Sequence, residues 1–404
     1  MGAGPPSCAG TLSHGGPRGA GLVTGPPGIG GPRVEDPGIE DVSVDDAGVE
    51  AVSVENGGTG GVATARPWGG SGPPTLERVA ESAGVSRATV SRVVNGSPRV
   101  SATSREAVLR AIEQLGYTPN RAARSLVTRR ADSIALVVSE SESRVFGEPF
   151  FAGIVRGVSQ ALAATDLQLV LVLAQTGRQH ARVERFVRNN HVDGVLLISL
   201  HGDDPLPRAL ISSGVPVVMC GRPPSSAADA PYVDADNFGG ARAATQFLLD
   251  QGRRRIASIT GPQDMAVGMD RLAGYQRALR DRRGGRDLVR AGDFSRDSGE
   301  HAMARLLTEA PELDAVFAAS DLMAAGAVRA LRRAGRRVPD DVAVVGFDDS
   351  EVARYTEPPL TSVRQPIDEM GREMVRLLLA QLDTGGAVAS PVILPTELVV
   401  RSST

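Results

Sequence analysis

Lysine is absent from the sequence, so arginine carries every permanent positive side-chain charge. The planar guanidinium group suits bidentate recognition of phosphates and carboxylates, although coding bias alone would produce the same usage. Aromatic residues make up only 3% of the chain, so a buried core must be built from Val, Leu, Ile and Ala. The hydrophobic share of 41% is large enough for such a core, and 404 residues allow two or three domains.

Cysteine is also scarce. Cys8 and Cys220 are far apart in the chain, which argues against a disulfide framework and against a zinc site. The five histidines show no metal-ligand spacing, and we expect neither a metal nor a cofactor. No apolar run could span a membrane, and no basic segment followed by an apolar one marks an export signal. These absences favour a cytoplasmic location, and association with the nucleoid if the protein binds DNA.

Residues 1–73 are rich in Gly and Pro and contain an acidic repeat, VEDPGIEDVS (34–43) followed by VDDAGVEAVS (44–53). So few large apolar groups cannot offset the entropy of ordering, and we expect this tail to be disordered. A mistaken translation start and a protein-interaction segment stay open as alternatives. The glycine-rich stretches of the tail lack the Gly-Lys-Ser/Thr sequence and the strand and helix that a phosphate loop requires.

A basic segment follows the tail. Residues 75–131 carry ten Arg and four Glu, whereas residues 1–72 carry three Arg and eight acidic residues. The net charge of the whole chain is only −3, so the positive charge is local. A compact basic segment is the electrostatic footprint expected for phosphate binding, with a solvated basic face as the alternative.

Three short helices are predicted between residues 75 and 116, because each begins with a capping side chain and has helical apolar spacing. The first helix is expected to be capped by Thr75 and to end at Ala83. The second is expected from the cap Ser86 to Val94, and the third from the cap Ser101 to Leu115. A tight turn at Gly84 joins the first two helices, which predicts a helix-turn-helix motif. The second helix presents side chains suited to base edges and phosphates in the DNA major groove, namely Arg87, Ala88, Ser91, Arg92 and Asn95.

From Ser133 onward, short apolar runs alternate with amphipathic helical stretches. This alternation is typical of parallel sheets covered by helices on both faces, so the predicted fold class is α/β. About 270 residues exceed one comfortable sheet, which predicts two α/β lobes. The expected strands are residues 134–139, 167–174, 192–199, 215–220, 255–261, 315–320, 342–348 and 392–401.

Five stretches of the sequence are characteristic when they occur in this order. The longest is AGVSRATVSRVVNGSPRVSATSREAVLRAIEQLGYTPNRAARSL (83–126). The others are DRLAGYQRAL (270–279), ASDLMAAGAVRAL (319–331), VVGFDDSEVARYTEPPLTSVRQP (344–366) and LPTELVVRSST (394–404). Through these stretches, residues 75–404 resemble the LacI/GalR (lactose/galactose repressor) family of transcriptional regulators.

The resemblance implies a domain organisation. A helix-turn-helix headpiece with a hinge helix is expected at residues 74–131. A periplasmic-binding-protein-like body of two α/β lobes is expected at residues 132–404. One lobe would consist of residues of about 133–235 with 365–392, and the other of residues 236–364 with 393–404.

The resemblance also assigns DNA contacts within the headpiece. Arg87, Ala88 and Arg92 are expected to read bases. The polar side chains near them are expected to hold phosphates or the helix itself, and these are Ser86, Thr89, Ser91 and Asn95. For Thr89, packing or capping is an equal alternative, since phosphate contacts position a protein more than they specify sequence.

The segment after the headpiece helices resembles a hinge helix that orders on operator DNA. Tyr117 and Asn120 match positions that hold the linker and the DNA backbone. Leu126, beside Ala123, is expected to wedge into the minor groove and bend the duplex, with Arg121 in the basic flank. Ordinary linker packing is the alternative for Leu126.

A small-molecule effector, expected to be a sugar, would bind between the two lobes. Sugars are bound by carboxylate and guanidinium groups that pair with hydroxyls, and by an aromatic face. The candidates by resemblance are Phe150, Phe151, Arg222, Arg271, Phe294, Ser320, Asp321 and Asp348, with Arg271 and Asp348 the strongest. A core position for Phe151 and helix capping by Asp321 and Asp349 are the alternatives.

Two departures from the family leave the identity of the effector open. Gly221 stands where some members have an acidic residue for sugar hydroxyls, and Arg222 is a candidate substitute. The connection SESESRVFGEP (139–149) is several residues longer than is usual in the family. We expect it at the mouth of the cleft.

The implied regulator is a homodimer on a near-palindromic double-stranded operator, with repression as the usual mode. A dimer is expected because the chain ends soon after its last strand. Effector binding would change the angle between the lobes and so the affinity for DNA. A periplasmic solute-binding protein would need an export signal, and an enzyme would need a catalytic motif that we do not find. The sequence gives neither the operator nor the direction of the effector's action.

Overall fold

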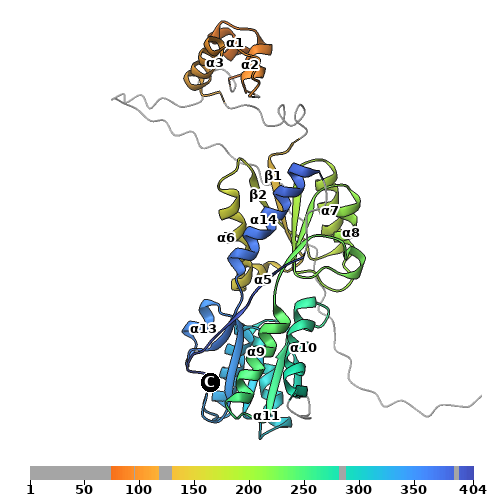
Figure 1. Cartoon of the computed structure of the whole chain (residues 1–404), viewed down its shortest axis with the longest axis vertical. Helices are drawn as coiled ribbons and strands as arrows, with labels where there is room; N and C mark the ends of the chain where they lie inside the picture. Colours follow the sequence, from red (N-terminus) through yellow and green to blue (C-terminus); the bar gives the residue numbers. More distant parts are fainter. Residues whose placement is uncertain (1–73, 95, 118–129, 282–287, 386–390) are drawn as a thin grey trace, which may run out of the picture. The chain divides into compact units, whose positions relative to one another are not determined.

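The computed structural model describes residues 74–94, 96–117, 130–281, 288–385 and 391–404. The tail predicted for residues 1–73 therefore lies outside the described residues. A bundle of three helices comes first in the chain, and two α/β lobes follow it (Figure 1). Among the described residues, no helix is both long enough and apolar enough to cross a membrane.

The headpiece contains three helices where the sequence predicts them. Thr75 and Ser101 cap two of these helices, each accepting a hydrogen bond from the backbone N–H three residues on, at 3.5 and 3.2 Å. Gly84 and Gly116 end the same two helices with φ angles of 62° and 60°, a left-handed conformation that glycine adopts without strain. The helices are α1 (Leu76–Ala83), α2 (Arg87–Val94) and α3 (Ala102–Leu115).

Each headpiece helix contributes a valine to a small common core. Val79, Val90 and Val108 are fully buried, and Ala80 and Tyr117 pack with them. The apolar face predicted for each helix is therefore the face that packs inward.

Lobe 1 is built on a six-stranded parallel sheet. Its elements are β1 (Ser133–Val138), α5 (Glu142–Gly147), α6 (Pro149–Leu162), β2 (Gln168–Leu173), α7 (Gly177–Arg188), β3 (Gly194–Ile198), α8 (Leu206–Ser212), β4 (Val217–Cys220), the 3-10 helix η1 (Ser225–Ala227), β5 (Tyr232–Ala235), α14 (Ile367–Thr384) and β11 (Val392–Leu394). The strand order is β11-β5-β4-β3-β1-β2, and every neighbouring pair is parallel.

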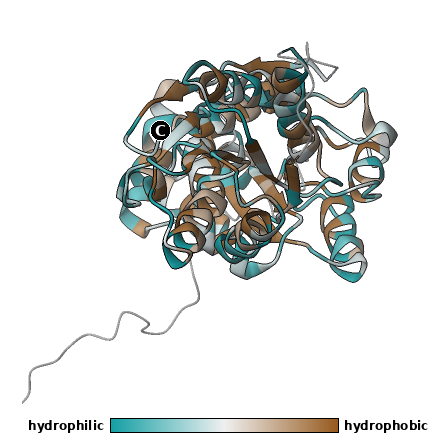
Figure 2. Ribbon diagram, turned by 90° about the horizontal axis from the view of Figure 1, so that it is seen from below, coloured by the Kyte–Doolittle hydropathy of each residue, from teal (hydrophilic) through white to brown (hydrophobic). Residues whose placement is uncertain are grey.

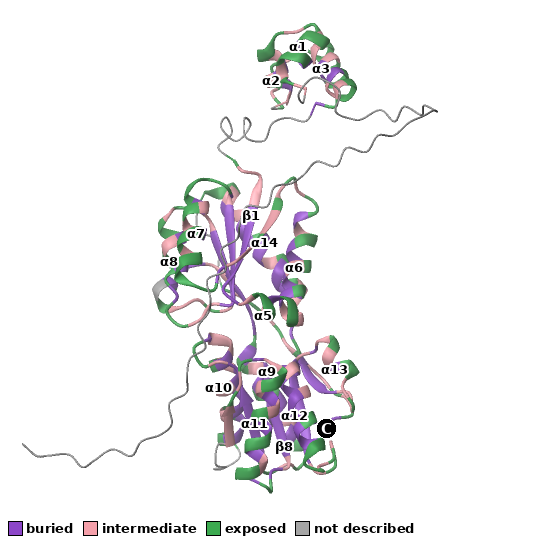
Figure 3. Cartoon of the chain, turned by 180° about the vertical axis from the view of Figure 1, so that it is seen from behind, coloured by how far each residue is buried: buried purple, intermediate pink, exposed green. Residues whose placement is uncertain are grey.

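Alternate residues of β1 face opposite sides of this sheet. Ile134, Leu136 and Val138 pack against α6 and α14, whereas Ala135 and Val137 pack against α7 and α8. All five are fully buried. Coverage of both faces explains why the strands are continuously apolar rather than alternating. Figure 3 shows the buried strands at the centre of each lobe and exposed residues on the outer faces of the helices.

Lobe 2 repeats this architecture. Its elements are α9 (Asn237–Asp250), β6 (Ile256–Thr260), α10 (Ala266–Asp281), β7 (Leu288–Ala291), α11 (Arg296–Glu309), β8 (Ala315–Ala318), α12 (Asp321–Arg333), β9 (Ala343–Asp348), α13 (Glu351–Tyr355), β10 (Thr361–Arg364) and β12 (Glu397–Val399). The strand order is β12-β10-β9-β8-β6-β7, and only the pair of β10 and β12 is antiparallel.

The core of lobe 2 also has two layers. On β8, Val316 and Ala318 pack against α11 and α12, and Ala315 and Phe317 pack against α9 and α10. Figure 2 shows apolar strands enclosed by helices whose outer faces are hydrophilic. The α/β fold class predicted from the alternating apolar runs is confirmed.

The chain passes from one lobe to the other after β5, after β10 and between β11 and β12. The prediction of a single strand over 392–401 is therefore wrong, because the run is divided between the two sheets. Pro395 lies at the division, and a proline lacks the N–H that a continuous strand would need. Three four-residue strands, β5, β7 and β10, were not predicted, because each contains charged or hydroxyl side chains.

Candidate functional site

A cavity lies between the lobes, at the carboxyl ends of the parallel strands of both sheets. Ligands of open α/β sheets bind at this end of the strands, because the connecting loops converge there. The lining residues are Arg144, Glu148, Pro149, Phe150, Phe151, Ser199, Leu200, Cys220, Gly221, Arg222, Asp234, Asn237, Met265, Ala266, Val267, Arg271, Phe294, Ser320, Leu322, Asp348, Ser350, Gln365 and Met370.

Arg271 of α10 is the most deeply buried charge in the cavity wall, at 3% exposed. Its Nε donates to Asn237 Oδ1 at 2.9 Å, and its Nη1 donates to the carbonyl of Ala319 at 2.6 Å. The guanidinium carbon lies 3.7 Å from the centre of the Phe347 ring, within range of a cation–π interaction. Burial lowers the pKa of Arg271, and the nearby Asp348 carboxylate opposes this.

Asp348 ends β9 and faces Arg271. Its Oδ1 lies 3.4 Å from Arg271 Nη1 and accepts a hydrogen bond of 2.7 Å from Gln365 Nε2. Burial raises the pKa of Asp348 to about 6. A fixed guanidinium and a carboxylate side by side can donate to one sugar hydroxyl and accept from its neighbour.

Backbone strain is concentrated at the cavity. Six non-glycine residues in the described part of the chain have positive φ angles, and three of them line the cavity, namely Ser199 (60°), Phe294 (72°) and Asp348 (113°). Such conformations cost about 1–3 kcal/mol each and gather at ligand sites, where they aim side chains. The backbone angles therefore support a ligand site at the cavity, independently of its shape.

A second polar group lies where β4 and β5 end. The Asp234 carboxylate accepts from the backbone N–H of Arg222 at 3.1 Å and from Asn237 Nδ2 at 2.9 Å. Burial raises the pKa of Asp234 to about 6. Asn237 also accepts from Arg271, so the two polar groups are connected by hydrogen bonds.

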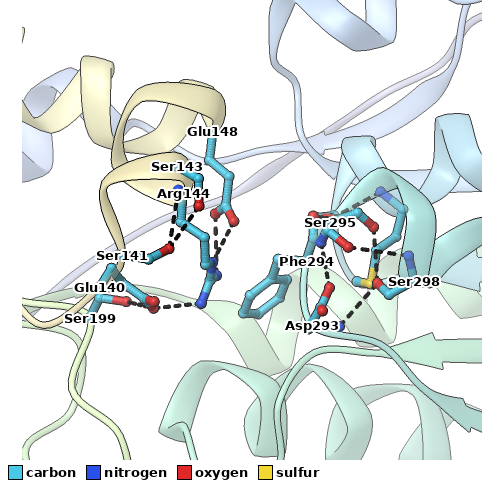
Figure 4. A network of polar contacts seen from close by, with 12 residues as sticks. Glu140, Ser141, Ser143, Arg144, Glu148, Ser199, Asp293, Phe294, Ser295 and Ser298 are labelled. Carbon is cyan, nitrogen blue, oxygen red and sulfur yellow. Dashed lines mark hydrogen bonds and ion pairs between the residues drawn. The ribbon is translucent and has the colours of Figure 1, made fainter. Parts of the chain in front are cut away.

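The long connection at 139–149 contains α5, and its residues Arg144, Glu148 and Pro149 line the cavity. Figure 4 shows the polar contacts of Arg144 with Glu140 and Glu148. Arg144 Nη1 donates to Glu140 Oε1 at 2.6 Å, and Arg144 Nε donates to Glu148 Oε1 at 2.7 Å. Burial raises the pKa of Glu148, although Arg144 opposes the shift.

Two ion pairs connect the lobes beside the cavity. His201 of lobe 1 lies 2.9 Å from Asp264 of lobe 2 and 2.9 Å from Glu140 of its own lobe. Arg222 of lobe 1 lies 2.6 Å from Asp270 of α10. The structure is therefore one in which the lobes are in contact.

The effector residues expected from the sequence are mostly brought together. Seven of the eight line the cavity, namely Phe150, Phe151, Arg222, Arg271, Phe294, Ser320 and Asp348. Phe151 is also a core residue, at 2% exposed. Asp321 is the exception, because its fully buried carboxylate accepts from the hydroxyls of Ser350 and Ser362 at 3.0 and 2.6 Å instead of lining the cavity. Asp349, the other acid weighed as a cap, is bound by Arg364 and Arg401.

Sequence reasoning missed several polar residues of the cavity, namely Arg144, Glu148, Asp234, Asn237 and Gln365. Asp234 belongs to β5 and Asn237 follows it, so a prediction of that short strand would have placed both at the carboxyl edge of the sheet. No signal in the sequence marks Arg144 and Glu148 beyond the unusual length of their connection.

The headpiece presents the expected surface on α2. Arg87, Ala88 and Arg92 are exposed, and Ser91 is half-buried. Arg87 forms an exposed ion pair with Glu77 at 3.0 Å. Ser86 is exposed, and its hydroxyl caps α2 by accepting from the N–H of half-buried Thr89 at 3.2 Å.

Tyr117 is buried in the headpiece core, at 7% exposed, and packs with the core residues of the three helices. The remaining DNA-contact predictions lie outside the described residues, and these are Asn95, Asn120, Arg121, Ala123 and Leu126. Across the described ranges, no group of three or more His, Cys, Asp or Glu side chains is arranged to hold a metal ion.

A helix-turn-helix headpiece followed by a two-lobed body with a polar cavity defines the class of DNA-binding regulators controlled by small molecules. Comparison with known proteins identifies the family. Residues 75–120 match the model of bacterial regulatory proteins of the lacI family, and residues 245–404 match that of the periplasmic binding protein-like domain.

Individual relatives agree with these matches. The chain is 56% identical over 335 residues to the HTH-type transcriptional regulator CelR of Thermobifida fusca, which covers 82% of this chain and 98% of CelR. It is 34% identical over 334 residues to the ribose operon repressor of Halalkalibacterium halodurans, with 82% and 97% covered.

Solved structures give the same result. A transcriptional regulator CelR–cellobiose complex is 54% identical, with a TM-score of 0.66 over 82% of this chain and all of that one. The lac repressor dimer bound to operator and the anti-inducer ONPF is 31% identical, with a TM-score of 0.73 over 82% of this chain and 99% of that one. The protein belongs to the LacI family and is a DNA-binding transcriptional regulator, not an enzyme.

Proposed function

We propose that this protein is a repressor that binds its operator as a homodimer and responds to cellobiose held between its two lobes. One observation carries the proposal. The cavity sets the Arg271–Asp348 pair beside Phe294 in a chain that is 54% identical to a regulator solved as a complex with cellobiose. No cofactor is required for this function.

The sugar would be recognised chiefly by lobe 2. Arg271 donates to hydroxyls, Asp348 accepts from a neighbouring hydroxyl, and Phe294 offers an aromatic face. Arg222, Ser320, Phe150 and Phe151 complete the expected site, of which Phe151 is chiefly a packing residue. Asp321 is omitted because its carboxylate is already bound by two serines.

The headpiece would read DNA through α2. Arg87, Ala88 and Arg92 are assigned to base edges, and Ser86, Thr89 and Ser91 to phosphates or to the helix itself. Five residues outside the described ranges and Tyr117 are assigned to DNA on the family resemblance alone, and the five are Asn95, Asn120, Arg121, Ala123 and Leu126. We divide the chain functionally into the headpiece at 74–131 and the effector-binding body at 132–404.

The two functions would be coupled by a shift in population. If cellobiose favours one angle between the lobes, it changes the distance between the two headpieces of a dimer and so the affinity for a two-part operator. Coupling of this kind is typically about 1–3 kcal/mol, or about 5- to 150-fold in affinity. We infer that cellobiose releases the operator.

The decisive experiment has two stages. Random duplex DNA is first selected with the full chain at a stated salt concentration, because phosphate contacts are salt-dependent. Binding of the selected site is then titrated with cellobiose, and with maltose as a matched control that differs only in its glycosidic linkage. Enrichment of one near-palindromic site that cellobiose releases and maltose does not would support the proposal. A specific site that neither sugar affects would exclude cellobiose as the effector.

The base-reading assignment has its own test. Arg92→Ala should weaken binding to the selected operator by about 1–3 kcal/mol and leave cellobiose binding unchanged, because only a base contact is lost. Arg110→Ala is the control, since Arg110 is an exposed arginine of α3 outside the recognition helix. Equal operator affinity of the two variants would exclude Arg92 from base recognition.

A further inference from the structure

The segment around α5 carries a charged group in the cavity wall. Arg144 lies within α5, whereas Glu140 precedes this helix and Glu148 directly follows it. Arg144 lies between the two carboxylates and donates to both, at 2.6 and 2.7 Å. Its Nη2 also donates to the second oxygen of Glu148 at 3.3 Å.

Stability does not explain this arrangement. Partly buried ion pairs lose hydration, and apolar side chains of the same size are often as stable or more stable in their place. The side chains of Arg144 and Glu148 are only 23% and 13% exposed. Burial raises the pKa of Glu148, which shows that the surroundings disfavour its charge. A charged pair that stays in a cavity wall despite this loss of hydration indicates that the pair recognises a ligand.

Both side chains retain capacity to bind another molecule. A guanidinium group has five N–H donors, and the three hydrogen bonds of Arg144 within the described residues use three of them. A carboxylate offers about four lone-pair sites, and the bonds from Arg144 use two on Glu148. The pair can therefore donate to one hydroxyl and accept from another.

The opposite wall supplies an aromatic face. Phe294 of lobe 2 lines the same cavity, and Figure 4 shows its ring opposite the Arg144 side chain. The ring is held in place, because Phe294 has a φ of 72° and because a Cβ on Gly261 would lie 2.2 Å from its Cζ. A sugar ring binds well between an aromatic face and groups that pair with its equatorial hydroxyls.

The charged pair is also fixed from behind. Glu140 accepts from the Ser199 hydroxyl at 2.6 Å and lies 2.9 Å from His201 Nε2. Since Glu140 is 5% exposed and held from three sides, it fixes the position of Arg144. Fixed side chains discriminate between ligands better than mobile ones.

We propose that Arg144 of α5 and Glu148, which directly follows that helix, form a second sugar subsite, which binds the outer ring of a disaccharide against Phe294 and so selects disaccharides over monosaccharides. The inference rests on the proposed function, because the inner ring is taken to bind at Arg271 and Asp348. It assigns a role to the connection that is longer here than is usual in the family.

Calorimetry with the full chain, using cellobiose and glucose, tests this subsite. Glu148→Gln and Arg144→Gln should each weaken cellobiose binding about tenfold or more, equal to about 1.4 kcal/mol. Glucose binding should change less than about twofold, because the inner site is intact. Glu142→Gln is the matched control, since Glu142 is an exposed glutamate of the same connection, at the start of α5.

Retained glucose binding shows that each variant is folded, and the double variant with both substitutions provides a second, charge-neutral test. Selective loss of cellobiose affinity in these variants supports the subsite. An unchanged ratio of cellobiose to glucose affinity in variants that bind both sugars overturns it. If the unaltered chain binds glucose or another sugar but not cellobiose, the proposed effector is wrong, and that result is distinct because it appears before any substitution is made.

Discussion

The two lobes have the same strand order, yet they supply different kinds of groups to the cavity. In lobe 2, the Arg271 side chain is 4% exposed and is fixed by Asn237 and Ala319. In lobe 1, the side chains of Arg144 and Arg222 are 23% and 48% exposed and are carried on a short helix and a turn. Lobe 2 therefore forms a rigid base, whereas lobe 1 contributes groups that can vary without loss of the fold.

This difference predicts the largest effect at Arg271. Arg271→Met keeps an unbranched apolar stem but removes the guanidinium group, which leaves the largely buried Asp348 without its cationic partner. We expect the free energy of unfolding to fall by about 3–5 kcal/mol, as is usual when one partner of a buried ion pair is removed. Cellobiose binding should be lost as well. Urea unfolding followed by circular dichroism, together with calorimetry, would measure both effects.

Arg222→Ala provides the contrast in lobe 1. Its ion pair with Asp270 is half-exposed, and such pairs contribute only about 0–1 kcal/mol. Similar losses of stability in the two arginine variants would contradict the distinction between a rigid and a variable lobe.

The second largest effect is expected at Gly261. In Gly261→Ala the new methyl group would meet the Phe294 ring, whose strained backbone limits the ways in which it can move. Such overpacking costs about 1–3 kcal/mol of stability, and a displaced ring should weaken cellobiose binding as well. Thermal unfolding and calorimetry on the same variant would show both changes.

Gly214 of lobe 1 is the matched control, because it does not line the cavity. A Cβ there would meet nothing within 4 Å, although its φ of 80° makes any substitution strained. Gly214→Ala should therefore cost stability with little effect on Phe294. If Gly214→Ala weakens sugar binding as much as Gly261→Ala does, Phe294 is not part of the rigid base.

Local signals explain why the headpiece could be predicted closely. Thr75 and Ser101 cap helices, and Gly84 and Gly116 end them, and all four act within one turn of their own position. The long buried strands of the body were also predictable from their apolar runs. Short strands were not, because in β5 and β10 the tertiary position outweighs the local preference of polar residues.

The residues of the cavity also differ in how far the sequence predicts them. Arg271 and Asp348 are 77 residues apart, and only the family resemblance suggested that they belong to one site. Asp321 was included for the same reason, but its environment is decided by Ser350 and Ser362, which no local pattern reveals. Arg144 and Glu148 could not be predicted as cavity residues, because nothing in the sequence determines the fold of their long connection.

The smallest predicted effect concerns the ion pair that joins the lobes. His201 Nδ1 lies 2.9 Å from Asp264 Oδ2, and Nε2 lies 2.9 Å from Glu140 Oε1. Ionised carboxylates only accept hydrogen bonds, so both contacts are hydrogen bonds when the imidazole is protonated and both ring nitrogens donate. Arg144 pairs with Glu140 at 2.6 Å and so adds a positive charge to this group.

The pH dependence of sugar binding tests whether this contact holds the lobes together. The hydrogen bond to Glu140, assisted by that to Asp264, raises the pKa of His201 above its ordinary value of 6.5, although burial opposes the shift. Stabilisation of the closed lobes is therefore complete below pH 6.5 and is lost as the pH rises through the raised pKa. Cellobiose affinity should fall over that range by less than about tenfold, because the ring is one-third exposed and such pairs are weak.

Calorimetry in two buffers of different ionisation enthalpy should show that sugar binding takes up protons above pH 6.5. His201→Gln should remove this uptake, since glutamine does not titrate. His191→Gln should keep it, because His191 is exposed and stacks on Phe186 instead of bridging the lobes. Proton uptake that persists in His201→Gln would mean that another group titrates on closure. In that case the contact between the lobes would be a consequence of closure and not one of its causes.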